Sequence, residues 1–118
     1  MSRKIKRPIV KRESYYRDEF AKIIDGEVEV RLDDKTSCDI VTEEYACEVD
    51  WANKWAEAVG QSLHYSQKLN KKPAVVLLVK KDSDYLKARF IENIFDKLEL
   101  EYKIWVLDTN KCEYFKVV

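Results

Sequence analysis

The chain has 118 residues, of which 46% are hydrophobic and 37% are charged, and its formal net charge is zero. This length allows one hydrophobic core of ordinary size, so we expect a single domain over residues 13–118. The balanced charge argues against a protein that coats nucleic acid nonspecifically. Because the longest apolar run, Ala74 to Val79, is too short to cross a bilayer, we expect a soluble, cytoplasmic protein without a membrane partner.

Residues 1–12 form a basic N-terminal arm before the predicted domain. Six of these twelve residues are basic: Arg3, Lys4, Lys6, Arg7, Lys11 and Arg12. One interpretation is that the arm contacts nucleic-acid phosphates, with Lys11 and Arg12 as substrate-binding residues next to the domain. The alternative is an arm that stays solvated and takes no part in binding.

The first half of the chain predicts one helix followed by three strands. Apolar residues at helical spacing predict a helix from about Glu13 to Ile24. The three strands are expected at Glu27–Leu32, about Cys38–Thr42, and Tyr45–Trp51. In the first strand the alternation places Val28, Val30 and Leu32 on one inner face. These strands should pair as an antiparallel meander because short turns join them.

The second half predicts helices alternating with strands. The expected elements are a helix of about Ala52–Leu69, a strand at Ala74–Val79, a helix of about Ser83–Leu100, and strands at Tyr102–Leu107 and Glu113–Val118. Ser83 is the candidate N-cap of the last helix. The unbroken apolar run of residues 74–79 is typical of a central strand covered on both faces. A strand–helix–strand passage requires a parallel pair, so we expect an α/β (α+β) fold with a mixed sheet flanked by helices.

Carboxylates on two neighbouring predicted strands are the most informative polar residues. Asp39 interrupts an apolar strand, while Glu48 and Asp50 share a face with Ala46 on the next. Asp39 and Glu48 would repel each other when buried, and a divalent cation is the simplest remedy. The alternative is that Asp39 is an outward-facing acid paired with Arg31 across the hairpin.

The helix that follows these strands carries further polar groups along one stripe. Lys54, Ala58, Gln61 and Tyr65 fall within a narrow arc at helical spacing. A lysine, an amide and a phenol directed to the same end of a sheet suit a surface that faces phosphate. The alternative is that Lys54 and Glu57 belong to a solvated face and Tyr65 to the core.

Structural roles are expected for the remaining distinctive residues. The single histidine, His64, lies off this stripe and is expected to be structural or exposed. Cys38 and Cys47 are expected to be small core residues that strand alternation turns away from the acids. The tryptophans are expected in the core or at an interface: Trp51, Trp55 and Trp105. The aromatic complement also allows a homodimer to which Trp105 or Phe115 contributes.

These motifs, in this order, resemble the PD-(D/E)xK nuclease superfamily. Asp39 and Glu48 match its metal-binding acids on the second and third strands, and Gln61-x-x-x-Tyr65 resembles the QxxxY motif of its RecB-like and lambda-exonuclease-like branch. The run from Tyr45 to Gln61 is similar to small single-domain members found in bacteria and mobile elements. The resemblance spans roughly residues 13–79 and implies a restriction endonuclease-like core of helix, three-strand meander, helix and strand.

The resemblance implies a metal-dependent nuclease that hydrolyses the phosphodiester bonds of DNA with Mg²⁺ or Mn²⁺. It makes Asp39 the central metal ligand and Glu48 the second, with the backbone carbonyl of Val49 as a third oxygen. Glu13 would be the acid that the first helix adds at the edge of the metal site. Glu19 is the competing choice for this last role.

One position departs from the superfamily pattern. Asp50 stands where a lysine is usual; it brings no positive charge and could bind the metal instead. Lys54 would then act as a migrated catalytic lysine, Gln61 would orient water or phosphate, and Tyr65 would contact the substrate backbone. If Lys54 points away, the alternative is an inactive nuclease-like fold that serves as a nucleic-acid or protein binding module.

Overall fold

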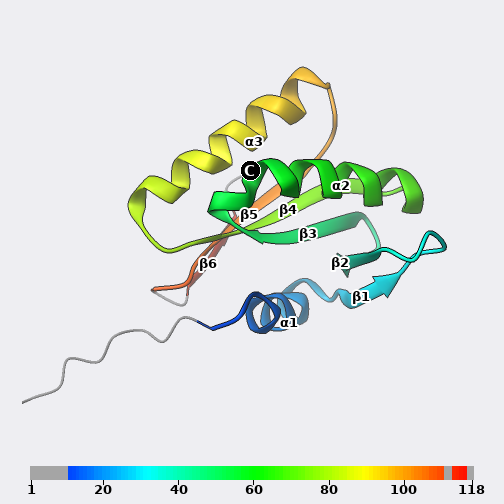
Figure 1. Ribbon diagram of the computed structural model, residues 1–118, viewed down its shortest axis with the longest axis horizontal. Coiled ribbons are helices and arrows are strands. Elements are labelled where there is room, and N and C mark those ends of the chain that lie inside the picture. Colours follow the sequence, from blue (N-terminus) through cyan, green and yellow to red (C-terminus); the bar gives the residue numbers. More distant parts are fainter. Residues whose placement is uncertain (1–10, 111–112, 117–118) are drawn as a thin grey trace, which may run out of the picture.

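Three helices flank one mixed six-stranded sheet (Figure 1). The computed structural model describes residues 11–110 and the backbone of residues 113–116. The elements are α1 (Glu13–Ile24), β1 (Glu27–Arg31), β2 (Ser37–Val41), β3 (Tyr45–Trp51), α2 (Trp55–Leu69), β4 (Lys72–Val79), α3 (Leu86–Lys97), β5 (Lys103–Asp108) and β6 (Glu113–Lys116). The first ten residues of the basic arm lie outside this described part, so their contact with phosphates stays a prediction.

The strands follow one another across the sheet in chain order, from β1 to β6. β1, β2 and β3 are antiparallel, β3, β4 and β5 are parallel, and β6 runs antiparallel to β5. The predicted meander and the predicted parallel pair are both confirmed. The carboxyl ends of β3, β4 and β5 therefore lie at one edge of the sheet, and β3 brings Glu48 and Asp50 toward that edge.

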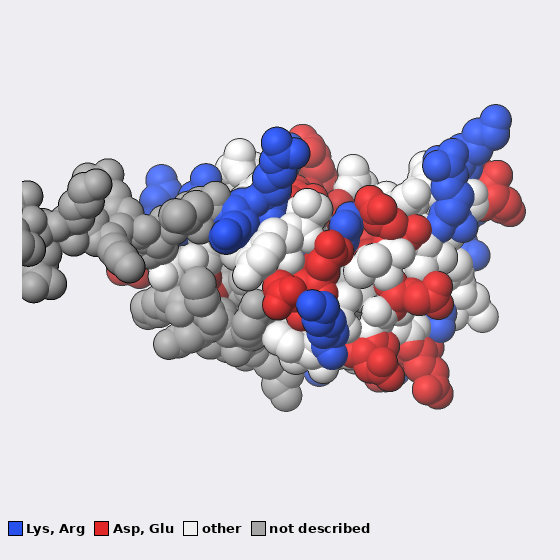
Figure 2. Space-filling model, turned by 90° about the horizontal axis from the view of Figure 1, so that it is seen from below, with Lys and Arg blue, Asp and Glu red and all other residues white. Residues whose placement is uncertain are grey.

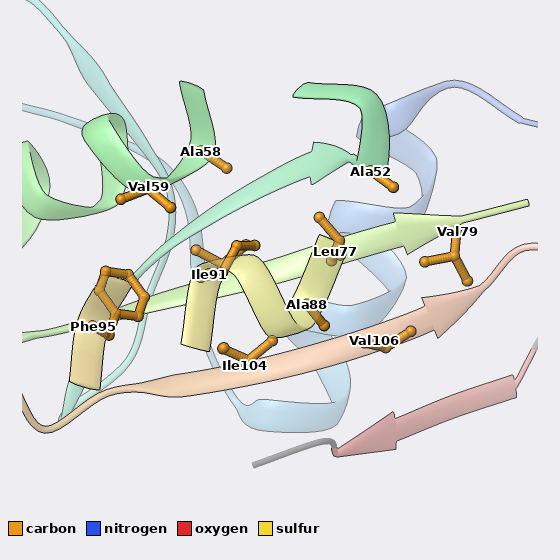
Figure 3. Packing of buried hydrophobic residues seen from close by; sticks show 11 residues of the cluster. Ala52, Ala58, Val59, Leu77, Val79, Ala88, Ile91, Phe95, Ile104 and Val106 are labelled. Atoms are coloured by element: carbon orange, nitrogen blue, oxygen red, sulfur yellow. The ribbon is translucent and has the colours of Figure 1, made fainter. Parts of the chain in front are cut away.

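Helices cover both faces of the sheet, with α2 and α3 on one side and α1 on the other (Figure 1). β4 is buried along almost its whole length, as its apolar run predicted. Val75, Leu77 and Val79 face α2 and α3, where Figure 3 shows Leu77 and Val79 in the same core as residues of α3 and β5. Residues of β4 that alternate with these, such as Val76, pack under α1. Each fully buried aliphatic side chain contributes about 1.5–3 kcal/mol, so β4 anchors the fold.

The boundary between α1 and β1 fixes how these two elements meet. α1 has the predicted bounds and ends at Asp25, whose left-handed backbone (φ 56°) closes the last turn. Gly26 follows, and a Cβ atom there would collide with Cγ2 of Ile40, which is fully buried in β2. Glycine is therefore required by close packing between this turn and the strand that carries Asp39.

Both later helices begin after a 3₁₀ turn, which the sequence analysis did not predict. Residues 52–54 form one such turn before α2, and residues 82–85 form another before α3. Ser83 is not the N-cap of α3, because it lies within the second 3₁₀ turn and Tyr85 occupies the N-cap position. In that turn the Oδ2 atom of Asp84 accepts the backbone N–H groups of Lys80 and Lys81 at 2.9 and 3.2 Å. Within the described residues, none of the helices combines the length and apolar composition needed to span a membrane.

The first strand is less regular than its alternating sequence suggests. Val28 is 40% exposed, whereas Leu32 is buried and Val30 is half-buried. Glu29 has a left-handed backbone (φ 50°), which a carboxylate side chain adopts only at some cost in energy. This residue breaks the pleat, so the inner face predicted for Val28 is wrong.

Trp105 on β5 lies in the core beneath α1. Its ring is half-buried and packs edge-on against Phe20 and Tyr45, with ring centroids 5.2 and 5.9 Å away. The side chain of Phe115 lies outside the described part of the chain. Homodimer formation through either residue stays a prediction.

Candidate active site

Strand β3 delivers two carboxylates to the same side of the sheet. Glu48 and Asp50 are each only 5% exposed, and Ala46, two residues before Glu48, packs with Tyr65 of α2. Val49 faces the opposite way and belongs to the core under α1. Simple strand alternation thus explains why both acids share a face with Ala46, as the sequence predicted, and the structure shows that this face is the α2 side.

Asp39 joins this group from β2 through an unusual contact between the strands. In the backbone ladder between β2 and β3, Ile40 pairs with Cys47 and Val41 pairs with Ala46. At the next step the Oδ2 atom of Asp39 accepts the backbone N–H of Val49 at 2.8 Å. A side chain thereby takes the place of a backbone partner and holds the carboxylate against β3.

The acids associate as two hydrogen-bonded pairs, Asp39 with Glu48 and Glu13 with Asp50. Burial, followed by the charge of Asp39, raises the pKa of Glu48 to about 10. Burial, followed by the charge of Asp50, raises the pKa of Glu13 to about 7. Burial also raises the pKa of Asp39 and of Asp50. Each pair needs a shared proton or a cation, because two carboxylates in contact cannot both stay charged at low cost.

Lys54 is the first lysine after the two acids of β3 in the sequence. It is exposed at the end of the 3₁₀ turn after β3. Its positive charge partly offsets the rise that burial causes in the pKa values of Glu13 and Asp50. Glu19, the competing acid of α1, instead pairs with Lys22 at 3.0 Å on the surface. The structure therefore brings Glu13, and not Glu19, to the carboxylates of β3.

Helix α2 contributes one residue to this group and leaves another at the surface. Tyr65 is buried beside the acids, and burial together with the charges of Glu48 and Asp39 raises its pKa to about 12. Gln61 is exposed one turn earlier and, among the residues that the structure describes, makes no hydrogen bond to the acids.

The two described residues of the basic arm lie at the start of α1. Lys11 and Arg12 are exposed, and the ammonium of Lys11 lies over the ring of Tyr15, 5.3 Å from its centroid. The backbone N–H of Lys11 donates to the hydroxyl of Tyr16 at 3.0 Å. Neither basic side chain forms an ion pair with the acids in this part of the chain, so their binding of substrate stays a prediction.

Arg17 is a site residue that the sequence analysis missed. Its guanidinium pairs with Asp18 and Glu29 at 2.9 Å each, and its charge lowers the pKa of Asp39. Among the described residues, Arg31, the partner that the sequence offered for Asp39, forms no ion pair with it. The sequence signal that could have identified Arg17 is helical spacing, because this residue lies four residues after Glu13 and so shares its side of α1.

Cys38 lies nearer to the acids than strand alternation predicted. It packs with Ala46 and Tyr65 on the α2 side, so the expectation that it turns away from Glu48 is wrong. Burial raises the pKa of its thiol to about 12, and the charges of Asp39 and Glu48 act in the same direction. The thiol therefore stays protonated and serves as a small packing residue, as does the fully buried Cys47.

His64 connects α2 to the turn between β1 and β2. Its Nε2 atom lies 2.7 Å from Oδ2 of Asp34, and one helical turn later Lys68 pairs with Asp33 at the same distance. These contacts hold the hairpin against α2 and agree with a structural role for the histidine.

The donor chemistry at Asp39 and Glu48 fits a hard divalent cation. Within residues 11–110, no three His, Cys, Asp or Glu side chains form a group that could hold a metal ion. Mg²⁺, however, is commonly bound by only one or two carboxylates, with water and phosphate oxygens completing its shell. Asp39 and Glu48 provide two such carboxylates, and a cation between them would remove the need for the proton that they share.

The carboxylates do not lie in the larger hollows of the surface. One of about 570 Å³ opens at the other end of the parallel strands, beside Lys72 at the start of β4. Lys72 is held there by Glu44 and Glu101 at 2.8 Å each, which leaves it poorly placed to bind an anion. The buried carboxylates are the candidate site, because buried acids with raised pKa values cluster at functional sites.

Among the described residues on the face that α1 covers, charges of both signs mix and form no broad basic surface (Figure 2). Comparison of the chain with protein-family models, with curated proteins and with solved structures finds no match. The functional conclusion therefore depends on the geometry of the acids and Lys54.

Proposed function

We propose that this protein is a metal-dependent nuclease of the PD-(D/E)xK type that hydrolyses phosphodiester bonds of DNA. The observation that carries this proposal is the presence of two neighbouring carboxylate pairs, Asp39 with Glu48 and Glu13 with Asp50, the second of them near Lys54. The chain order of helix, three-strand meander, helix and strand supports it, because the resemblance implies this order.

In this proposal Asp39 and Glu48 hold Mg²⁺ or Mn²⁺, and the backbone carbonyl of Val49 adds a third oxygen. Asp50 and Glu13 lie beside this pair and extend the negative site outward. When bound, such an ion polarises the phosphate and lowers the pKa of a bound water. The contact between Asp39 and Glu48 supports a cation there, because a cation would favour the charged form of both carboxylates, which burial disfavours.

Lys54 supplies the positive charge that Asp50 cannot. It is exposed and forms no ion pair with the described residues, so its ammonium could meet a phosphate that approaches the acids and stabilise developing negative charge. Gln61 lies exposed on α2 one turn before Tyr65, and we assign it to orienting water or phosphate. Tyr65 would contact the substrate backbone through its hydroxyl group, which its raised pKa keeps protonated.

A nuclease-like binding module without hydrolysis is the second candidate, and Asp50 is the observation that favours it. This acid occupies the usual lysine position, is 5% exposed and is hydrogen-bonded with Glu13. A buried acid there adds negative charge near the path of a phosphate. The two candidates differ in whether Lys54 offsets that charge.

The test is hydrolysis of a panel of supercoiled DNA, linear duplex, single-stranded DNA and RNA with Mg²⁺ or Mn²⁺. We expect nicking of DNA that Asp39→Ala abolishes. Asp33→Ala is the matched control, because Asp33 is an exposed acid in the turn between β1 and β2. If no substrate is cleaved with any divalent metal, the protein is not a nuclease and the binding module remains.

A further inference from the structure

A second hollow lies at the same edge of the sheet as the carboxylates. Its volume is about 290 Å³, and it opens between the end of β3 and the segment after β4. Trp51, Asn53, Lys80 and Lys81 are among the residues that line it. Trp51 directly follows Asp50, and its backbone N–H donates to Oδ1 of that acid at 3.2 Å. The indole packs with the core under α1, on the opposite face of β3 from Glu48 and Asp50, so a molecule in this hollow would reach the proposed catalytic centre around the carboxyl end of β3.

The indole of Trp51 is held in place but not fully covered. Tyr16 of α1 packs edge-on against it, with ring centroids 5.8 Å apart and planes at 84°. The ammonium of Lys80 lies over the same indole, 4.6 Å from the ring centroid. The indole is only half-buried, so a fixed aromatic surface with a cation beside it faces the hollow.

The two lysines of the hollow are held by their backbone and not by ion pairs. Asp84 accepts the backbone N–H groups of Lys80 and Lys81, which fixes the turn after β4. In the described part of the chain neither ammonium forms an ion pair, in contrast with Lys68 and Lys72. Both side chains are exposed, so both can bind an incoming phosphate.

We propose that this hollow binds one unpaired nucleotide of the substrate strand, next to the phosphodiester that is cleaved. The base stacks on the face of the Trp51 indole over which the Lys80 ammonium lies in the free protein. Lys80 moves off the ring to bind the adjoining phosphate, and Lys81 binds the next one. Stacking on an aromatic ring combined with lysine contacts to phosphate is how proteins bind single strands without reading their sequence. A base that stays paired within a duplex cannot reach the indole, so the hollow selects single-stranded or frayed DNA. This inference rests on the proposed function for the identity of the ligand.

Binding in the presence of EDTA tests the hollow separately from hydrolysis. The probe is a fluorescein-labelled octathymidylate, and fluorescence anisotropy gives its dissociation constant across a range of salt concentrations. We expect Lys80→Ala and Lys81→Ala each to weaken binding about fivefold to tenfold. Each should also reduce the slope of log affinity against log salt by about 0.7, the value for one lost phosphate contact on a single strand.

Lys87→Ala is the matched control, because Lys87 also lies over an aromatic ring, that of Phe90 at 5.6 Å, but on α3. Its binding should equal that of the unaltered protein. Equal affinity in all variants, or no binding of the octathymidylate by the unaltered protein, overturns the inference. The inference is also overturned if a blunt duplex binds as tightly as the single strand and if Lys80→Ala weakens the binding of both equally.

Photocrosslinking tests the base contact without a substitution that could disturb folding. An octathymidylate with one 5-iododeoxyuridine should form an adduct that mass spectrometry locates at Trp51. An adduct only at Trp55 or Trp105 overturns the stacking arrangement. If the lysine variants bind the octathymidylate normally while Asp39-dependent cleavage persists, the proposal that the hollow binds a nucleotide is wrong and the nuclease proposal is retained. If the adduct and the lysine effects appear without any cleavage, the hollow stands and the nuclease proposal fails.

Discussion

The carboxylate of Asp39 accepts the backbone N–H of Val49 at 2.8 Å, where β2 and β3 would otherwise continue as an ordinary ladder. The contact needs a short side chain with an oxygen acceptor, and the same carboxylate is hydrogen-bonded with Glu48. The local departure from regular sheet structure is thus the feature that assembles the site.

Divalent metal should stabilise the folded protein through these two acids. At pH 8, Mn²⁺ or Mg²⁺ at 100 times its dissociation constant is expected to add about 2.7 kcal/mol to the free energy of unfolding. Thermal unfolding with metal and with EDTA measures this difference. Asp39→Asn and Glu48→Gln should each remove most of the gain, whereas Asp33→Asn should retain it. A gain that survives both site substitutions would place the metal elsewhere.

Without metal, stability should fall as the pH rises. Glu48 has a pKa of about 10 in the folded protein against an ordinary value of 4.5, so between these values the folded state binds more protons than the unfolded state. Glu13 acts in the same direction between pH 4.5 and about 7. Each such group lowers the free energy of unfolding by at most about 1.4 kcal/mol per pH unit. Urea unfolding in EDTA from pH 5 to pH 8 measures the slope.

Glu48→Gln should flatten that pH dependence and stabilise the metal-free protein at pH 8 by about 1–3 kcal/mol. The amide keeps the size of the side chain and can donate to Asp39 without an added proton. Glu57→Gln is the control, because Glu57 is exposed on α2 and should leave the slope unchanged. A steeper slope in Glu48→Gln would show that the acid is charged in the folded state.

Lys54 should matter for hydrolysis and not for the fold. Lys54→Met is expected to slow DNA cleavage about 100-fold to 1000-fold, as loss of a group that stabilises transition-state charge does. Its free energy of unfolding should change by less than about 0.5 kcal/mol, because the side chain is exposed. Lys97→Met, at the exposed end of α3, is the control for loss of charge alone. Unchanged cleavage by Lys54→Met would remove the migrated lysine from the mechanism.

The two glycines of the chain should respond oppositely to alanine. Gly26→Ala is expected to destabilise the protein by about 1–3 kcal/mol, because its new methyl group would collide with buried Ile40. Gly60→Ala, in the exposed interior of α2, meets nothing within 4 Å and should stabilise by about 0.5–1 kcal/mol. Chemical denaturation compares both with the unaltered protein. If Gly26→Ala leaves the free energy of unfolding unchanged, α1 and β2 can shift to make room for the methyl group without loss of stability.

Much of this architecture could be predicted because local signals agreed with tertiary packing. The helix from Glu13 to Ile24 and the strand from Tyr45 to Trp51 have the predicted bounds, and the apolar run of β4 indicated its central place. The face shared by Glu48 and Asp50 also followed from simple alternation.

The failures lie where the backbone departs from regular geometry. The left-handed backbone of Glu29 exposes Val28, and the contact of Asp39 with Val49 accompanies the turn of Cys38 toward α2. No periodic pattern encodes such local breaks. Arg17 was missed for a different reason, because its closeness to Asp39 depends on how α1 packs across the sheet.

The most direct test of the central claim is the rate at which excess protein nicks supercoiled DNA as Mg²⁺ or Mn²⁺ is added. We predict cleavage that requires the metal, is lost in Asp39→Asn and persists in Asp33→Asn. Absence of cleavage by the unaltered protein, or equal cleavage by Asp39→Asn, would contradict the proposal that Asp39 and Glu48 form a metal-dependent catalytic centre.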